Sequence, residues 1–404
     1  MLAKRVVVVA VATVAGLAMP CFGLEATTNA APSQPASAQA PAQLQSDRAL
    51  AMQVGEMEMY GTPRLPGRTW VQVGSQVYGA SADAQGPVGG GDKYKAVITS
   101  ATLTVATLDE LLAALARAKA GDVVFVAAGS RIDCTERVVA EQLVIQIPAG
   151  VTLAGDRGHG GSPGAMIFSD AFGTGPLIRA AGDNVRVTGL RIRGPDPKRR
   201  LEHHRRSYEQ GLGDGYYYKF PISYGLATEH DGLEVDNCEL AGFGHSAVRL
   251  DAGQDHRVHH NVIHHCQRAG LGYGIFLDRA TARISFNLFD WNRHSIAGTG
   301  APGSGYEADH NVQLEHSLSH HFDMHGGKDR RDGTDIAGEW MKVHHNTFLG
   351  SMQTVRIRGT PQRKAEIRYN WFGQSSSSEV VWSKGRTEVR DNAFGPEGQS
   401  FMAP

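Results

Sequence analysis

The chain has 404 residues, of which 41% are hydrophobic, so it is long enough to bury a large core and is not a disordered polymer. Its formal net charge of -1 excludes a general basic field that would hold a nucleic acid or another polyanion. We therefore expect a monomer without a nucleic-acid partner, and any acidic partner must be met by locally placed charges.

Residues 1–23 have the pattern of a secretion signal. Lys4 and Arg5 precede an apolar run from Val6 to Met19, which a short break at 20–23 ends. The run is too short and too early to span a membrane. We therefore expect a secreted or periplasmic protein with no membrane span.

The segment that follows the signal carries few signs of regular structure. Residues 24–50 are rich in Ala, Pro, Gln and Ser, and we interpret them as a disordered linker. Residues 51–104 are rich in glycine with single aromatic residues, which indicates an irregular N-terminal covering segment. Beyond the signal only Cys134, Cys238 and Cys266 remain, so at most one disulfide can form within the chain. They are better explained as small buried apolar residues.

A short amphipathic helix is predicted after Thr107. Thr107 and Glu110 form the pattern of a capping box, and apolar residues follow at helical spacing. Strands are predicted next, at 121–129 and 145–155. A helix that covers the open end of a stack, followed by a first rung of strands, is typical of the start of a solenoid.

An asparagine recurs along the second half of the chain and determines the predicted architecture. The interval is roughly two dozen residues, and one interval is about ten longer, at Asn237, Asn261, Asn287, Asn311, Asn346, Asn370 and Asn392. Each unit holds short alternating apolar runs, which fit one three-sided coil. We predict an all-β fold, a single-stranded right-handed parallel β-helix with an N-terminal capping helix, over residues 105–398. The asparagines are interpreted as corner residues that build the coil.

Two insertions interrupt the repeat. The long interval contains a charged segment at 326–338, and a charged and aromatic segment lies at 195–224. Loops over the face of a sheet shape the groove that a ligand enters, so we expect these two to set substrate choice.

Candidate catalytic residues follow from aligning three strands that end before a glycine, at 322–326, 355–359 and 381–385. Alternation turns Phe322, Val355 and Val381 inward, so the outward columns are Asp323, Arg356, Trp382 and His325, Arg358, Lys384. A row of cations beside a histidine suits a uronic acid: the cations neutralise the sugar carboxylate, and the histidine removes the acidified C5 proton. The catalytic candidates are thus His325, Arg358, Arg356 and Lys384.

Other polar residues leave alternatives open. Asp323, Trp382, Tyr306 and His321 are candidates for substrate binding, the two aromatic rings by stacking on sugars. His321, Asp323 and His325 alternate and could ligate a transition metal, although we assign no metal ligand. No definite cofactor follows; carboxylates leave Ca²⁺ binding or a hydrolase pair open, namely Asp278, Asp290, Glu307, Asp323, Asp332, Asp335 and Glu339.

Two short motifs resemble known enzymes. The segment from Val343 to Phe348, followed by Arg356, Arg358, Pro361 and Arg363, resembles the pectate lyases of the pectin-lyase-like superfamily, and the likeness extends over residues 105–395. The resemblance implies that Arg356 or Arg358 is the base. The strand from Phe322 to His325 also resembles mannuronan C5-epimerases, which implies that His325 and Arg358 act as a pair.

The preferred interpretation is a secreted polysaccharide lyase that abstracts the C5 proton of a uronic acid and eliminates the 4-linked sugar, with His325 as the base. A uronan C5-epimerase is the nearest alternative, because reprotonation of the same carbanion from the other face inverts the centre. A glycoside hydrolase and a non-catalytic glycan-binding protein remain as further classes.

Overall fold

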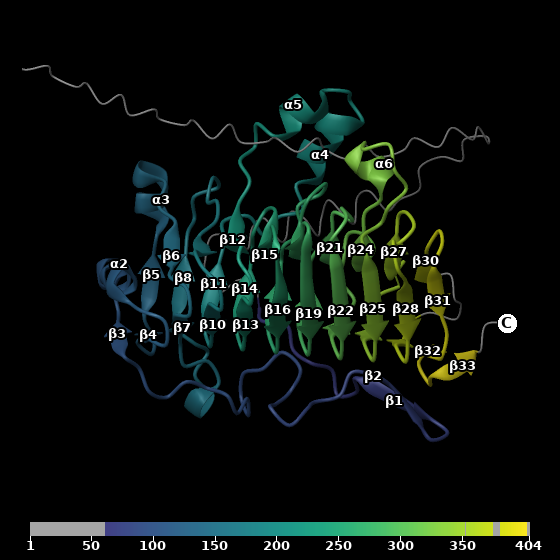
Figure 1. The fold of residues 1–404 in the computed structure, drawn as a ribbon, viewed down its shortest axis with the longest axis horizontal. Helices are drawn as coiled ribbons and strands as arrows, with labels where there is room; N and C mark the ends of the chain where they lie inside the picture. The colour runs from purple at the N-terminus through teal and green to yellow at the C-terminus, as the bar shows by residue number, and fades with distance from the viewer. Residues whose placement is uncertain (1–60, 352, 375–379, 402–404) are drawn as a thin grey trace, which may run out of the picture.

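The computed structural model describes residues 61–351, 353–374 and 380–401. The predicted signal peptide and linker lie outside these residues. The described chain winds into a stack of coils whose strands form three long sheets (Figure 1). Neighbouring strands within the three sheets are parallel, except for the last pair, β32 and β33. The predicted all-β parallel β-helix is confirmed.

The strands are named here by sheet, in stacking order. Sheet 1 comprises β3 (Leu103–Val105), β4 (Val123–Val126), β7 (Thr152–Ala154), β10 (Arg186–Thr188), β13 (Glu234–Asp236), β16 (Gly253–His259), β19 (Ala280–Ser285), β22 (Gly305–Asp309), β25 (Trp340–His344), β28 (Ala365–Arg368) and β31 (Thr387–Val389). Sheet 2 comprises β5 (Arg131–Asp133), β8 (Met166–Phe168), β11 (Arg191–Arg193), β14 (Glu239–Ala241), β17 (Val262–His264), β20 (Leu288–Asp290), β23 (Val312–Gln313), β26 (Thr347–Phe348), β29 (Trp371–Phe372), β32 (Asn392–Phe394) and β33 (Gln399–Phe401). Sheet 3 comprises β6 (Ile145–Ile147), β9 (Ile178–Ala180), β12 (Tyr224–Thr228), β15 (Ser246–Leu250), β18 (Tyr273–Leu277), β21 (His294–Gly298), β24 (Phe322–Met324), β27 (Val355–Ile357) and β30 (Val381–Trp382).

The helices and a hairpin lie outside these sheets. They are the hairpin β1 (Trp70–Val73) and β2 (Gln76–Gly79), a 3-10 turn at His159–Gly161, and the helices α2 (Leu108–Arg117), α3 (Thr135–Glu141), α4 (Leu201–Tyr208), α5 (Gly213–Tyr217) and α6 (Gly327–Arg330). As predicted, α2 begins after Thr107 with a capping box to Glu110. Its buried face, which includes Leu111 and Leu115, covers the first coil.

A ladder of buried asparagines holds the corner between sheets 1 and 2. The side-chain amide of each donates to the side-chain oxygen of the next at 2.9 or 3.0 Å, through Asn261, Asn287, Asn311, Asn346, Asn370 and Asn392. Each amide also donates to a backbone carbonyl of an earlier coil, as Asn346 does to Ala308. The corner role predicted for these residues is confirmed.

Asn237 was aligned one residue out of phase. Glu239 pairs with Val262, so the residue opposite Asn261 is Cys238, whose N–H donates to the Asn261 side chain at 2.8 Å. Asn237 instead has a positive φ of 51°, in the left-handed region that asparagine tolerates. The ladder therefore begins at Asn261, and a cysteine occupies its position one coil earlier.

Two segments cover the outer faces of the coil. Residues before 95 pack on sheet 2, where Ala80 and Val88 meet Val262 and Leu288. Tyr217, from the segment between β11 and β12 that contains α4 and α5, packs with Tyr273, Phe276 and Ala297 on β18 and β21 of sheet 3 (Figure 1). The outer face of sheet 3 is thus covered in its middle.

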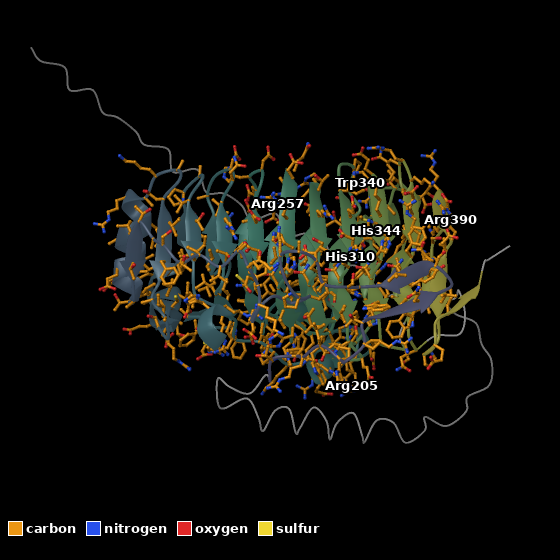
Figure 2. The ribbon with its side chains drawn as sticks, turned by 90° about the horizontal axis from the view of Figure 1, so that it is seen from below. Arg205, Arg257, His310, Trp340, His344 and Arg390 are labelled. Atoms are coloured by element: carbon orange, nitrogen blue, oxygen red, sulfur yellow. The ribbon has the colours of Figure 1, made fainter. Side chains whose placement is uncertain are left out.

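The outer face of sheet 1 is polar, and opposite charges lie on neighbouring strands. Arg257 pairs with Glu234 at 2.7 Å, and His344 lies 3.1 Å from Glu307 (Figure 2). The three cysteines predicted to be buried are buried and free. No helix in the described part of the chain is long and apolar enough to cross a membrane.

Candidate active site

The predicted row of polar residues lies on the outer face of sheet 3, on its last three strands. Asp323 on β24 pairs in register with Arg356 on β27, which pairs with Trp382 on β30. One step beyond the strands, the backbone N–H groups of His325 and Arg358 each donate to the preceding coil, at 2.9 and 2.8 Å. The strand alignment made from the sequence therefore gives the register of these coils correctly.

Asp323 is the centre of a buried cluster. Arg358 donates to both of its carboxylate oxygens, from Nε to Oδ1 at 3.1 Å and from Nη2 to Oδ2 at 2.7 Å. His325 Nε2 lies 2.8 Å from Oδ2, and His320 Nε2 lies 3.2 Å from the same oxygen. On its other side Arg358 reaches Asp329 at 3.4 Å, at the end of the chain segment that contains α6. Arg358 is thus already balanced by carboxylates of the protein.

Burial and charge together set the ionisation of this cluster. Burial alone would raise the pKa of Asp323, but the charges of Arg358, His320 and His325 hold that pKa well below its usual range. Burial lowers the pKa of Arg358, and the Asp323 and Asp329 charges overcome this and raise it. Asp323 is therefore an anion and Arg358 a cation, and the pair fixes this part of the coil.

Three side chains next to the cluster are more accessible. Arg356 is half-buried, and its guanidinium lies 5.1 Å from the centre of the Trp382 ring, which is 37% exposed. No carboxylate among the described residues pairs with Arg356. Lys384 is exposed and pairs with Asp335 at 2.9 Å. Of the predicted cations, Arg356 is thus the one that is placed to meet an external carboxylate.

Tyr306 and His321 are not placed to contact a sugar, and these two predictions are wrong. Tyr306 is fully buried within the coil, because it lies two residues before Ala308 on β22 and shares its inward direction. His321 is also fully buried and stacks on Phe348 at 6.2 Å between ring centres. It points inward because the Thr354 carbonyl accepts from two successive N–H groups, those of His321 and the next residue, which breaks the alternation.

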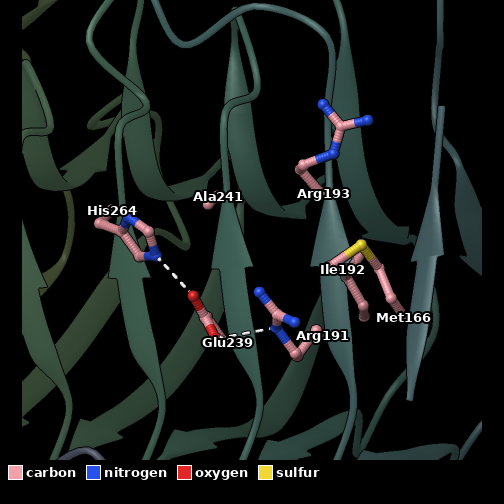
Figure 3. A pocket seen from close by; sticks show the side chains of 7 residues that line it. All are labelled: Met166, Arg191, Ile192, Arg193, Glu239, Ala241 and His264. Carbon is pink, nitrogen blue, oxygen red and sulfur yellow. Dashed lines mark hydrogen bonds and ion pairs between the residues drawn. The ribbon is translucent and has the colours of Figure 1, made fainter. Parts of the chain in front are cut away.

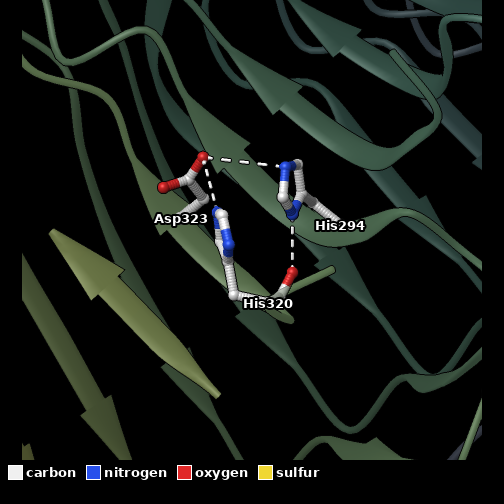
Figure 4. A group of neighbouring side chains, drawn as sticks. All are labelled: His294, His320 and Asp323. Carbon is white, nitrogen blue, oxygen red and sulfur yellow. Dashed lines mark hydrogen bonds and ion pairs between the residues drawn. The ribbon is translucent and has the colours of Figure 1, made fainter. Parts of the chain in front are cut away.

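Two histidines that were not predicted join the cluster instead. His320, rather than His321, lies beside Asp323, and His294 from the preceding coil lies 3.9 Å from the same oxygen (Figure 4). His294 and His320 are 26 residues apart, the same interval as between Asn261 and Asn287 in the ladder. That spacing was the available signal, and the break in alternation at His321 concealed it.

The carboxylates that could have formed a Ca²⁺ site or a hydrolase pair do not converge. Each has a cationic or histidine partner of its own: Asp278 with Arg279, Asp290 with His316, Glu307 with His344, Asp323 with Arg358, Asp332 with Arg330, Asp335 with Lys384, and Glu339 with Arg363. Asp290 lies on sheet 2 and Asp323 on sheet 3, so the proposed hydrolase pair does not form.

A separate pocket lies on the outer face of sheet 2, over β8 to β17 (Figure 3). At its floor the Glu239 carboxylate lies 3.2 Å from both Arg191 and His264, and Thr62 donates to it at 2.8 Å. Burial alone would raise the pKa of Glu239, but the hydrogen bond and charge of His264 and the charge of Arg191 lower it to about 2. The floor of this pocket is a closed ion network rather than a free acid.

The Glu239→Gln variant is expected to lose stability at neutral pH and to depend less on acid. A lowered pKa means that the carboxylate stabilises the fold above its unfolded pKa of about 4.3, and that this contribution, roughly 3 kcal/mol, is lost as the pH falls toward 2. Urea unfolding at a series of pH values measures it. Glu229→Gln, at a carboxylate that is 64% exposed, is the control. Parallel pH curves for wild type and Glu239→Gln would contradict the expectation.

The comparisons with known proteins concern the fold. No protein-family model matches the sequence, and no curated protein matches it. An alginate lyase from Paenibacillus sp. str. FPU-7 is structurally similar, at 15% identity, a TM-score of 0.48 and coverage of 74% of this chain and 97% of that chain. The chain has the parallel β-helix fold of the pectin-lyase-like superfamily.

Two further solved structures are similar. They are a family 28 exopolygalacturonase from Yersinia enterocolitica (13% identity, TM-score 0.38, 71% of this chain and 62% of that chain) and a pectin methylesterase in complex with a hexasaccharide (10% identity, TM-score 0.37, 75% and 92%). Because the identities of all three structures are so low, none of these proteins defines the reaction of this chain.

Proposed function

We propose that this protein is a secreted or periplasmic lyase that cleaves a uronic-acid polysaccharide by removing the C5 proton and eliminating the 4-linked sugar. The observation that carries the proposal is the position of His325, held by Asp323 in the coil next to Arg356, a cation with no carboxylate partner among the described residues. A base and an unpaired cation on one face of a sheet are the two groups that this reaction needs.

The chemistry divides among these side chains. Arg356 pairs with the sugar carboxylate, which makes the C5 proton more acidic, and Trp382 beside it supports the sugar ring. His325 takes the C5 proton, the electrons of the C5–H bond form the C4–C5 double bond, and the C4–O bond breaks. The leaving oxygen takes a proton from Lys384, the next group in the row. Asp323 is a positioning residue that holds His325, and Arg358 holds Asp323 in turn.

The burial of His325 adds a requirement. Its side chain is 2% exposed, so the accessible neighbours Arg356 and Trp382 must move when a sugar enters. Hydrogen bonds at a catalytic site often reach their working geometry only with substrate bound, so this arrangement is compatible with a base. The part of sheet 3 that α4 and α5 do not cover is where a polysaccharide would lie.

The test is an assay of the purified chain on alginate, pectate, glucuronan and glycosaminoglycans. A lyase yields unsaturated ends that absorb in the ultraviolet, and we expect them with one of these polymers. Incorporation of solvent deuterium at C5 without cleavage would identify an epimerase instead. New reducing ends without unsaturation would identify a hydrolase, and binding without any product would leave a glycan-binding protein. Each of these three results would overturn the lyase.

A further inference from the structure

Three buried donor atoms converge on the outer face of sheet 3. They are Nε2 of His294 on β21, Nε2 of His320 just before β24, and an oxygen of Asp323 on β24 (Figure 4). The three atoms lie within 4.8 Å of one another, and the residues are 0%, 6% and 0% exposed. Since they come from adjacent coils, the stacking of the coils fixes their separation.

His294 is oriented as a ligand would be. Its Nδ1 donates to the backbone carbonyl of His320 at 2.6 Å, which leaves the lone pair on Nε2. That Nε2 atom is buried and makes no hydrogen bond among the described residues, and it faces Asp323. An unpartnered buried nitrogen costs about 1–3 kcal/mol. A backbone carbonyl that holds the far nitrogen of a histidine is the usual support for a metal ligand.

We propose that His294, His320 and Asp323 bind a divalent transition-metal ion, with Zn²⁺ the best match. Two imidazole nitrogens and one carboxylate oxygen are ligand types that Zn²⁺ takes, whereas Ca²⁺ takes oxygen ligands. The ion would satisfy the unpartnered nitrogen of His294 and balance the Asp323 charge at the same point. The site goes beyond the proposed reaction, since binding is measured without a polysaccharide.

Arg358 competes with the ion for this point. Its Nη2 lies 2.7 Å from the Asp323 oxygen and 3.1 Å from His320 Nε2, so two of the three donors already face a cation. The guanidinium must move away when the ion enters. Asp329 lies 3.4 Å from Nη1 of Arg358 and offers the displaced guanidinium a second carboxylate. Arg358 and the metal are therefore alternative counter-charges of Asp323.

Two other groups of acidic residues and histidine differ in the state of the histidine. They are Glu234, Asp236 and His259, and Glu307, Asp309 and His344, both on sheet 1. In each, both ring nitrogens of the histidine have a partner: His259 contacts His260 and Glu234, and His344 contacts His345 and Glu307. These groups are closed, and they supply matched controls.

The test is titration of the full chain, purified without a histidine tag and stripped with a chelator, with Zn²⁺ in a calorimeter. We expect one ion per chain and a raised melting temperature, and His294→Gln should weaken binding roughly 100-fold or more, since even partners of metal ligands cost 10- to 100-fold. His259→Gln and His344→Gln should bind as wild type does. Arg358→Gln should bind more tightly, and Asp329→Asn more weakly.

Several results would overturn the proposal. They are no binding by the unmodified chain, equal affinity in His294→Gln, or loss of the ion in His259→Gln or His344→Gln. Weaker binding by Arg358→Gln would overturn the competition between arginine and metal. Because a variant could fail to fold, Co²⁺ is also added to the unmodified chain, where visible absorption bands of nitrogen and oxygen coordination are expected, and their absence counts against the site. Failure of the polysaccharide assay leaves these readouts unchanged.

Discussion

His325→Gln is expected to lose unsaturated product by about 100-fold or more, the range in which a positioned acid or base contributes to catalysis. Glutamine has a similar length and can still reach Asp323, which lies 2.8 Å from His325 in the wild type, but it cannot accept the C5 proton. The loss should therefore appear in kcat, with a smaller change in KM, because Arg356 and Trp382 are unchanged. Initial rates of ultraviolet absorbance on the polymer found in the substrate assay measure it.

His264→Gln is the matched control. His264 is also a fully buried histidine beside a carboxylate, 3.2 Å from Glu239, but it lies on sheet 2, away from the proposed site. Its substitution should lower stability and leave kcat unchanged. If His325→Gln retains full activity, or if both variants lose activity equally, His325 is not the base. Circular dichroism of both variants checks that the coil is intact.

The register of the site could be predicted from the sequence because a parallel β-helix repeats in space what it repeats along the chain. Phe322, Val355 and Val381 are apolar residues before polar ones, and the alternation of a strand needs no further information to place Asp323, Arg356 and Trp382 outward. One coil follows another at the spacing of a strand, so residues of equal phase become neighbours.

The errors arise where the backbone departs from strict alternation. His321 turns inward because one extra residue enters the ladder before β24, and no residue type in that segment announces it. The one-residue error at Asn237 has the same origin, since a cysteine stands in the ladder position. The saturation of Arg358 by Asp323 and Asp329 was also beyond the sequence, because Asp329 lies in an inserted segment whose path follows no repeat. Tyr306 is different: its phase relative to Ala308 was readable.

Asn346→Ala is expected to lower the free energy of unfolding by about 2–4 kcal/mol. The Asn346 side chain accepts from the backbone N–H and the side-chain amide of Asn311, and it donates to the Ala308 carbonyl and to Asn370. Alanine leaves the two Asn311 donors without this partner in a corner where water does not reach, since both asparagines are fully buried. Denaturant unfolding, with the midpoint and slope fitted separately, measures the loss.

Cys238→Ala tests whether the loss comes from the ladder or only from a smaller side chain. Cys238 occupies the same corner position as the asparagines, but the residue opposite it in the coil before is Leu190, which has no side-chain donor. Its own N–H still donates to Asn261 after the substitution, so no backbone donor is orphaned there. We therefore expect a cost near ~1 kcal/mol, less than for Asn346→Ala. Equal costs at the two positions would mean that packing of the corner, rather than the chain of amide hydrogen bonds, holds the coils in register.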